Sequence, residues 1–451
     1  MNTSRRRNQE RPQSNDHLLR VLGMAFALAI GIGTTIGGGI LRTPGDIAAL
    51  LPNAWLFMGI WVFGALNALL GATVFSELGA MIPRAGGPYV FARRALGDYA
   101  GFFVGYTYWV QVCAVQAALS LLIGDYMPVL VPALAGRALA VGFAVLLVLV
   151  VLQWQGVRWG GYVQAIVTVI KMLAFTGLIV AAFVMPHPVF TSVTTHAVPH
   201  GFGLIVALIL AMQGIIFTYN GFFYVCFFGE ELRDPGRDIP RAIFRSVFLI
   251  IAVYLLLNLA FLWVLPISRM AHAPFVGGLM ARALFGERGD QVITAIVMVS
   301  LLGTINAQIL ISARLLLAMG RNGLFMRQAT TVNSGGTPTI AMLLGTGVAC
   351  VFMLSGTFNA VLGVIAVFMV VNYLLMYSSL IVLRLRKPTE PRPYRAWGYP
   401  WTTLLAILIG LVFLAGVVIS DQRHTLIALV CLIISYPLYL GLRKLKLTDK
   451  G

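Results

Sequence analysis

The sequence has little charge and few of the residues that build metal or disulfide sites. Only 10% of its 451 residues are charged, whereas 59% are hydrophobic and the mean hydropathy is +0.89. This composition excludes an ordinary soluble domain and indicates a polytopic membrane protein. The four cysteines lie in apolar runs without pairing or metal-ligand spacing, so they are expected to be core residues. No metal and no cofactor are expected.

Catalytic side chains are also scarce where a membrane enzyme would need them. All six histidines fall in tails or loops between apolar runs, at His17, His187, His196, His200, His272 and His424. A membrane-embedded enzyme is therefore the weaker alternative, because it needs a catalytic constellation at membrane depth. The net charge of +17 would suggest nucleic acid for a soluble protein. Here the basic residues lie in short loops, so the expected surroundings are a lipid bilayer and not nucleic acid.

Apolar runs of about 20 residues, bounded by charge, proline or glycine, predict an all-α chain with twelve transmembrane helices. The fourth run is the shortest of the twelve. The runs lie at residues 18–50, 55–82, 98–124, 137–155, 161–185, 201–229, 242–265, 290–321, 338–355, 358–384, 400–420 and 424–442.

Loop charge predicts how this chain is oriented. With the N-terminus in the cytoplasm, 25 of the 32 lysines and arginines fall inside and Lys171 lies within the fifth run. The asymmetry favours cytoplasmic termini, in an inner (plasma) membrane that is expected to be bacterial. No cleavable signal peptide is expected, since the polar arm leads into a run long enough to span. The basic residues expected outside are six: Arg42, Arg137, Arg269, Arg282, Arg288 and Arg423.

The first apolar run is too rich in glycine to form a regular helix. Residues 29–44 contain five glycines with two threonines between them, which predicts that the helix unwinds near its middle. Irregular backbone at membrane depth normally lines a binding site. The alternative is close packing of helices through small residues spaced by four. Gly33 and Gly37 have this spacing, but the next position in register is Leu41.

The sixth run carries a second irregularity at residues 217–223, F-T-Y-N-G-F-F, where poor helix formers cluster. Alternatively, these aromatic residues belong to an ordinary core and Asn220 hydrogen-bonds a neighbouring helix. Breaks in spans one and six suggest two five-helix halves related by an inverted repeat, with the substrate where both helices break. The expected domains are a cytoplasmic arm (1–17), two repeats (18–185 and 201–384), two additional helices (400–442) and a cytoplasmic tail (443–451).

Four stretches resemble motifs of one transporter family. Residues 33–40, G-T-T-I-G-G-G-I, resemble G-x-x-x-G-S-G-I-F, and residues 77–89, E-L-G-A-M-I-P-R-A-G-G-P-Y, resemble E-L-x-x-x-x-P-x-S-G-G-x-Y. Residues 230–243, E-E-L-R-D-P-G-R-D-I-P-R-A-I, resemble E-E-x-x-N-P-x-R-x-x-P-x-A-I, and residues 386–395, R-K-P-T-E-P-R-P-Y-R, resemble R-x-P-x-x-x-R-P-Y-R. The chain thus resembles permeases of the amino acid, polyamine and organocation superfamily, including bacterial relatives of the L-type amino acid transporters.

This resemblance implies a LeuT-like 5+5 fold and a secondary active transporter that works by alternating access. The substrate carboxylate would meet the amides of Gly38 and Gly39, and its ammonium would face the carbonyls of Thr35, Phe217 and Asn220. Phe217 would act as an aromatic gate. Gly38 departs from the family's serine and so removes a hydroxyl from this site. The implied substrate-binding residues are Thr34, Thr35, Gly37, Gly38, Gly39, Phe217, Thr218, Tyr219 and Asn220.

The substrate is expected to be a neutral amino acid. Residues 201–229 contain no Asp, Glu, Lys or Arg, and Phe223 stands where relatives that handle arginine place an acid. A cationic side chain would therefore lack a counter-ion. The alternatives are an amino acid/polyamine antiporter for cationic substrates and a passive channel. The sequence does not identify an accessory subunit, and protons are a candidate co-substrate.

Lys171 lies in the middle of the fifth span, where a lysine needs a compensating role. By resemblance, its ammonium replaces the cation of sodium-coupled relatives, beside the carbonyls of Ile32 and Gly33 and the hydroxyls of Ser300 and Thr304. Two interpretations stay open: a lysine that carries a proton during the cycle, and a permanently charged tether. Both predict sodium-independent transport.

The motifs around residues 77–84 and 230–241 mix acids and bases at the expected cytoplasmic face. One interpretation is that they form pairs of an inner gate. The other is helix capping, with Asp238 and Pro240 at the start of the seventh span.

Overall fold

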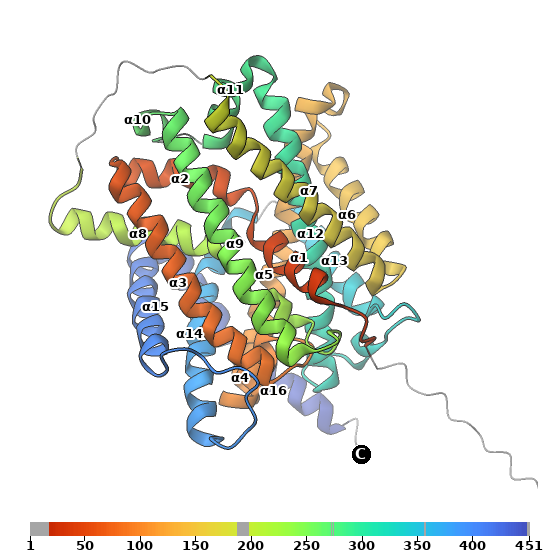
Figure 1. Cartoon of the computed structure of the whole chain (residues 1–451). Coiled ribbons are helices and arrows are strands. Elements are labelled where there is room, and N and C mark those ends of the chain that lie inside the picture. Colours follow the sequence, from red (N-terminus) through yellow and green to blue (C-terminus); the bar gives the residue numbers. More distant parts are fainter. Residues whose placement is uncertain (1–17, 187–197, 272, 274, 356–357, 449–451) are drawn as a thin grey trace, which may run out of the picture.

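The computed structural model describes residues 18–448 apart from 187–197, 272, 274 and 356–357 (Figure 1). The expected arm at residues 1–17 lies outside the described residues. Every element of the described part is a helix, and two isolated bridges, Leu22 with Leu232 and Ala85 with Phe228, are its β-type pairings. The prediction of an all-helical chain is confirmed.

The helices up to residue 186 include a long span that is broken in two. The first apolar run forms α1 and α2, with residues 36–38 between them. The remaining elements of this part are all helices. Their bounds are α1 Met24–Thr35, α2 Gly39–Leu50, α3 Ala54–Met81, α4 Pro88–Leu96, α5 Asp98–Leu130, η1 Pro132–Leu134, α6 Ala138–Trp154 and α7 Val157–Val184.

The helices after residue 198 begin with the second irregular span, which ends as a 3-10 turn. Two short helices, α10 and α11, precede the long α12. The bounds are α8 Phe202–Tyr219, η2 Tyr224–Phe227, α9 Pro235–Val264, α10 Ile267–Met270, α11 Val276–Phe285, η3 Gly286–Arg288, α12 Gly289–Arg321, η4 Arg327–Thr330, α13 Thr339–Ser355, α14 Phe358–Arg386, α15 Trp401–Ser420 and α16 Gln422–Thr448.

Several boundaries differ from the expected ones. α9 begins at Pro235 and not near residue 242, because proline is favoured in the first helical turn and the polar start of this helix hid it from the hydropathy pattern. α16 continues to Thr448, so most of the expected tail, 443–451, is helical. The short helices α4, α10 and α11 lie between the expected spans and were not predicted.

Ten described segments are long and apolar enough to cross a membrane, and α6 and α13, of 17 residues each, are apolar but shorter. α12 lies at the centre of the molecule, since nearly all of its residues from Ser300 to Gly320 are buried. α15 and α16 lie outside, with only 22% of their apolar windows buried. Figure 1 shows α10 and α11 at the opposite end of the bundle from α4.

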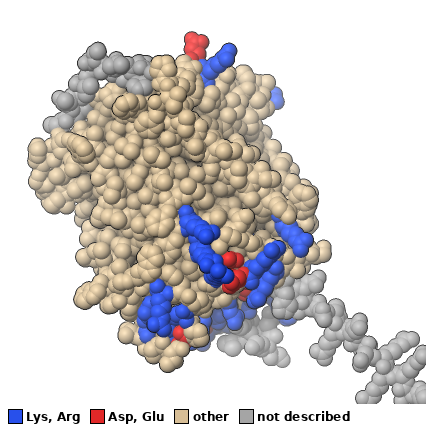
Figure 2. Space-filling model, in the orientation of Figure 1, with Lys and Arg blue, Asp and Glu red and all other residues tan. Residues whose placement is uncertain are grey.

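One end of the bundle is strongly basic, and we call it the basic end. On the face drawn in Figure 2, most of the lysines and arginines gather there, and a broad band without charged side chains separates them from the few charges at the other end. Such a band is expected where a membrane surrounds the protein. The residues used below to define the basic end are Arg84, Arg93, Arg94, Arg321, Arg384 and Arg392.

Candidate functional site

The break in the first span exposes backbone amides. α1 ends at Thr35 and α2 begins at Gly39, and Gly37, Gly38 and Gly39 are only partly buried. The first amides of any helix lack an intrahelical partner, and no hydrogen bond joins these three amides to another described residue. A Cβ on Gly39 would lie 3.6 Å from Oγ1 of Thr218, an ordinary contact. The start of α2 therefore offers donors and space to a ligand.

The sixth span breaks beside the first. α8 ends at Tyr219, and the extended residue Asn220 follows with φ −69° and ψ 139°. Gly221 has φ +125°, and a Cβ there would come within 2.8 Å of Thr35 Oγ1 and 2.9 Å of Thr34 Oγ1. Thr34 Oγ1 donates a hydrogen bond to the Gly221 carbonyl at 3.1 Å. Only glycine fits this conformation and this space. The two breaks therefore contact each other through Gly221.

Tyr254 on α9 joins both breaks and was not predicted. Its hydroxyl lies 2.7 Å from the carbonyl oxygen of Thr35 and 3.0 Å from that of Thr218, and the side chain is fully buried. One hydroxyl thus holds the last turns of α1 and α8 at a fixed separation. A tyrosine in an apolar run looks like an ordinary core aromatic, so the sequence carried no signal for this role.

Lys171 on α7 lies at the same break and is fully buried. Its Nζ donates to the carbonyl of Gly33 at 2.8 Å and to that of Ile36 at 2.6 Å. The second carbonyl is therefore that of Ile36 and not that of Ile32, which instead accepts the amide of Ile36. A lysine ammonium has three donors and no acceptor, so carbonyl oxygens suit it.

Ser300 and Thr304 on α12 donate to the same carbonyls as Lys171. Ser300 Oγ lies 3.2 Å from the Ile36 oxygen, and Thr304 Oγ1 lies 3.2 Å from the Gly33 oxygen. The two hydroxyls therefore share the carbonyls with the ammonium, and no hydrogen bond joins the ammonium to either hydroxyl. Together the three side chains tie α1 to α7 and α12.

The remaining predicted site residues lie on or beside the end of α8. Phe217 is 46% exposed, and its carbonyl accepts a hydrogen bond of 3.2 Å from the amide of Asn220. Thr218 Oγ1 lies 3.1 Å from Thr43 Oγ1 and donates to Gly214. Tyr219 is buried, and its ring packs 5.0 Å from that of Tyr254.

The side chain of Asn220 hydrogen-bonds a neighbouring helix, as the alternative interpretation expected, but the sequence did not identify its partners. Its Oδ1 accepts a hydrogen bond of 2.8 Å from the hydroxyl of Tyr373 on α14, and its Nδ2 lies 3.4 Å from the hydroxyl of Tyr224. The ring of Tyr373 packs against those of Phe75 and Phe223, which stack on each other at 4.1 Å. An aromatic cluster therefore positions the second break.

A buried ion pair joins α12 to the segment after η2. Arg314 on α12 donates to both carboxylate oxygens of Glu231 at 2.8 and 2.9 Å, and both side chains are fully buried. The guanidinium also lies over the ring of Phe228, which packs edge-on against Phe26. Arg314 lies within the expected span at residues 290–321, and the sequence did not indicate that its partner would be a buried acid.

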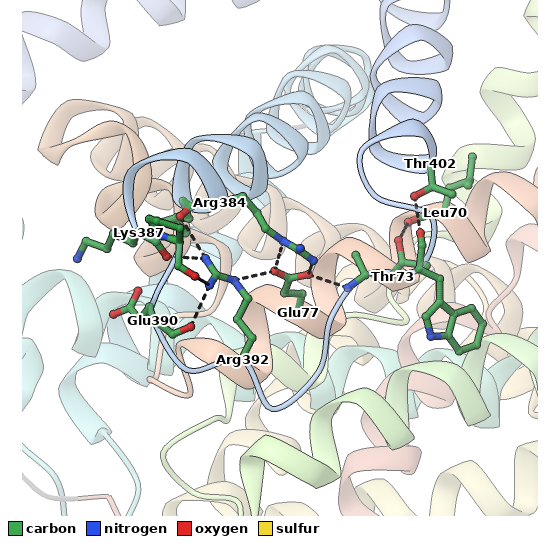
Figure 3. A network of polar contacts seen from close by, with 12 residues as sticks. Leu70, Thr73, Glu77, Arg384, Lys387, Glu390, Arg392 and Thr402 are labelled. Atoms are coloured by element: carbon green, nitrogen blue, oxygen red, sulfur yellow. Dashed lines mark hydrogen bonds and ion pairs between the residues drawn. The ribbon is translucent and has the colours of Figure 1, made fainter.

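Glu77 at the end of α3 holds a second buried network (Figure 3). Arg384 donates to both carboxylate oxygens of Glu77, at 2.7 and 2.5 Å. Arg392 donates to the same carboxylate at 3.1 Å, and the amide of Ala396 donates to it at 2.7 Å. Arg392 also donates to the carbonyl of Leu383 near the end of α14. One carboxylate thus fastens the segment after α14 to α3.

The acids of the two mixed-charge motifs find their partners elsewhere. Glu77 binds arginines from α14 and the segment after it, and Glu230 pairs with Arg321 of α12 at 2.6 Å. The capping interpretation is wrong in position, because α9 begins at Pro235 and Asp238 lies within its first turn. The described residues contain no group of three or more His, Cys, Asp or Glu placed to hold a metal ion.

Comparisons with known proteins agree on one class. The family model described as amino acid permease matches residues 18–436. The serine/threonine exchanger SteT of Bacillus subtilis (strain 168) is 29% identical over 439 residues, 95% of this chain and 98% of that protein. Asc-type amino acid transporter 1 of Mus musculus is 28% identical over 447 residues, 94% and 81% of the two chains. The large neutral amino acids transporter small subunit 2 of Homo sapiens is 27% identical over 405 residues, 84% and 72%.

Proposed function

The chain belongs to the amino acid permease family and transports amino acids, and on that premise we propose that it exchanges small neutral amino acids without sodium. The observation that carries the proposal is the meeting of two helix breaks beside a buried lysine. Gly221 of one break contacts Thr34 of the other, and the ammonium of Lys171 holds the carbonyls of Gly33 and Ile36.

In the proposed architecture the chain spans the membrane twelve times and contains an inverted repeat of five and five helices. The ten long apolar segments together with α6 and α13 supply these spans. The breaks then fall in the first helix of each half, α1 with α2 and α8 with η2, as in transporters whose sites form between discontinuous helices. α15 and α16 are additional, and the basic end faces the cytoplasm with both termini.

The two breaks provide opposite partial charges for a zwitterion. The substrate carboxylate binds the free amides of Gly38 and Gly39 at the positive end of α2. Its ammonium lies near the carbonyl ends of α1 and α8, where the helix dipoles are negative. The carbonyl of Thr35 already accepts from Tyr254, and that of Phe217 from Asn220. Each carbonyl keeps a second lone pair for the ammonium.

The charges that remain buried support a neutral side chain. Glu77 and Glu231 are the fully buried carboxylates of the described part, and arginines neutralise both. No acid therefore remains inside to balance a cationic substrate, which would be costly at membrane depth. The names of two relatives, a serine/threonine exchanger and a large neutral amino acids transporter subunit, agree with a neutral side chain.

The lysine acts as a fixed cation in place of sodium. Its ammonium is fully buried, and it shares both carbonyls with hydroxyls of α12. A cation bound in this way needs no exchange with solvent during the cycle, so the tether explains the contacts without a proton step. Since it occupies the position between the first break and α12, no sodium ion is required there.

Alternating access requires the basic end to open. In the described arrangement the Glu231–Arg314 pair, the Leu22–Leu232 bridge and the contact of Phe26 with Phe228 close that end. Phe217 is exposed and the glycines of the first break stay partly exposed. We take this to be a state open toward the other side, and inward opening separates Glu231 from α12.

Exchange by the purified protein in proteoliposomes tests this function. Uptake of labelled serine is expected to require an unlabelled neutral amino acid inside and to continue when choline replaces sodium. Internal arginine or lysine is expected not to support uptake. Uptake that depends on a sodium gradient, or that internal arginine supports as well as internal serine, would contradict the proposal.

A further inference from the structure

A polar cavity of about 430 Å³ lies at the basic end, away from the two helix breaks. Its walls come from the loop after α3, from α4 and the start of α5, from Glu230 and from the end of α12. Ile82, Ala85, Val90 and Ala318 are its apolar lining residues. The proposed transport cycle gives this cavity no role.

Arginine is in excess over acid in this cavity. Its lining includes four arginines, Arg84, Arg93, Arg94 and Arg321, against the two carboxylates of Asp98 and Glu230. Asp98 accepts from Arg93 at 2.7 Å, and Glu230 accepts from Arg321 at 2.6 Å. The two acids are thus each engaged by one arginine.

The other two arginines differ from each other. Arg94 pairs with Glu390, which does not line the cavity. Arg84 is exposed, and its backbone amide donates to the carbonyl of Ile82. No hydrogen bond or ion pair joins its guanidinium to another residue of the described part. Arg84 follows Pro83 in this loop, and the next residue, Ala85, is bridged to Phe228. The backbone at Arg84 is therefore held in place. A guanidinium without an acid thus lies on a fixed wall of the cavity.

We propose that this cavity binds a phosphate group, with Arg84 as the principal contact. Guanidinium forks match phosphate oxygens in geometry and charge, and their hydrogen bonds to ionised acceptors are stronger than neutral ones. A phosphate presents oxygens in several directions and can meet arginines from α4, α12 and the loop at once. A carboxylate is planar and has two oxygens, so it offers fewer acceptor directions than a phosphate.

The phosphate lies between α4, the loop before it and the end of α12. Arg93 of α4 donates to Asn322, which follows α12, and Arg321 holds Glu230. A ligand between Arg84 and these residues adds a further link across the same junction. Occupancy therefore stabilises the arrangement in which the basic end is closed.

Two sources share this chemistry: the headgroup of an anionic phospholipid and a free phosphate in solution. Anionic lipids attract basic segments next to the membrane surface. The test uses the full-length protein in phosphatidylcholine nanodiscs, titrated with inorganic phosphate against sodium chloride of equal ionic strength. A second arm replaces part of the lipid with phosphatidylglycerol, and both arms are read as thermal stabilisation.

Arg84→Gln is the informative variant, and Arg158→Gln is its matched control. Arg158 is another exposed arginine, and it does not line this cavity. We expect phosphate or phosphatidylglycerol to stabilise the unmodified protein. Arg84→Gln should weaken the apparent affinity about tenfold, as loss of a charged hydrogen bond does, while Arg158→Gln should not change it.

The outcomes separate the sources and can overturn the site. Stabilisation by inorganic phosphate that depends on Arg84 identifies a soluble ligand, and stabilisation by phosphatidylglycerol alone that depends on Arg84 identifies a lipid headgroup. Equal losses in Arg84→Gln and Arg158→Gln would show general charge screening and contradict the site. Absence of stabilisation in both arms would also contradict it.

Discussion

Tyr254→Phe removes one oxygen atom from the junction of the two helix breaks. In the unmodified protein, the hydroxyl lies 2.7 Å from the Thr35 carbonyl and 3.0 Å from the Thr218 carbonyl, with no solvent exposure. Without this hydroxyl, two buried carbonyls lose a hydrogen-bond donor, and this loss costs about 1–3 kcal/mol of free energy. If substrate binds only when both breaks keep their geometry, the apparent KM for a neutral amino acid rises about tenfold, since 1.4 kcal/mol is a factor of ten.

The matched control is Tyr108→Phe, the same chemical change beside the same break. The Tyr108 hydroxyl is buried without a hydrogen-bond partner among the described residues, and its ring packs 6.2 Å from Phe223. Its removal should leave the KM unchanged. Exchange kinetics in proteoliposomes measure both variants. An unchanged KM in Tyr254→Phe, or an equal rise in Tyr108→Phe, would refute the reasoning.

Three further variants test the rest of the site. Gly39→Val should abolish uptake but keep the protein folded, because its Cβ meets only ordinary contacts. Gly33→Ala should instead lower the melting temperature, since its Cβ would lie 2.6 Å from Thr168 Oγ1. Unchanged substrate affinity in Gly39→Val would contradict the amide site. Phe217→Ala should impair transport more than equilibrium binding, and equal losses would argue against a gate. Lys171→Ala should abolish exchange as well as uptake under a pH gradient, and retained exchange would favour a proton carrier.

The sequence predicted the helical class and the irregular first span for local reasons. Apolar runs and glycine content are properties of single segments, so they can be recognised without knowing what packs against them. Lys171 was singled out in the same way, because a charge in the middle of an apolar run needs a partner. Its partner at Ile36, rather than Ile32, depended on how the chain turns after Thr35.

The contacts between distant segments could not be predicted. Nothing near Glu77 indicates that Arg384 and Arg392, about 300 residues later, will bind its carboxylate (Figure 3). The pairing of Arg314 with Glu231 could not be predicted for the same reason. Tyr254 and Tyr373 act through one hydroxyl each, and hydropathy patterns do not distinguish a hydrogen-bonded tyrosine from one that only fills space. Pairing of this kind depends on tertiary packing.

The most direct test of the central claim is a structure of the protein determined with a bound neutral amino acid. The account predicts that the substrate carboxylate lies within hydrogen-bond distance of the amides of Gly38 and Gly39, with its ammonium toward the ends of α1 and α8. It also predicts that Nζ of Lys171 keeps its contacts with Gly33 and Ile36 and that no sodium ion lies beside them. An amino acid bound away from both breaks, or a sodium ion in place of the ammonium, would contradict it.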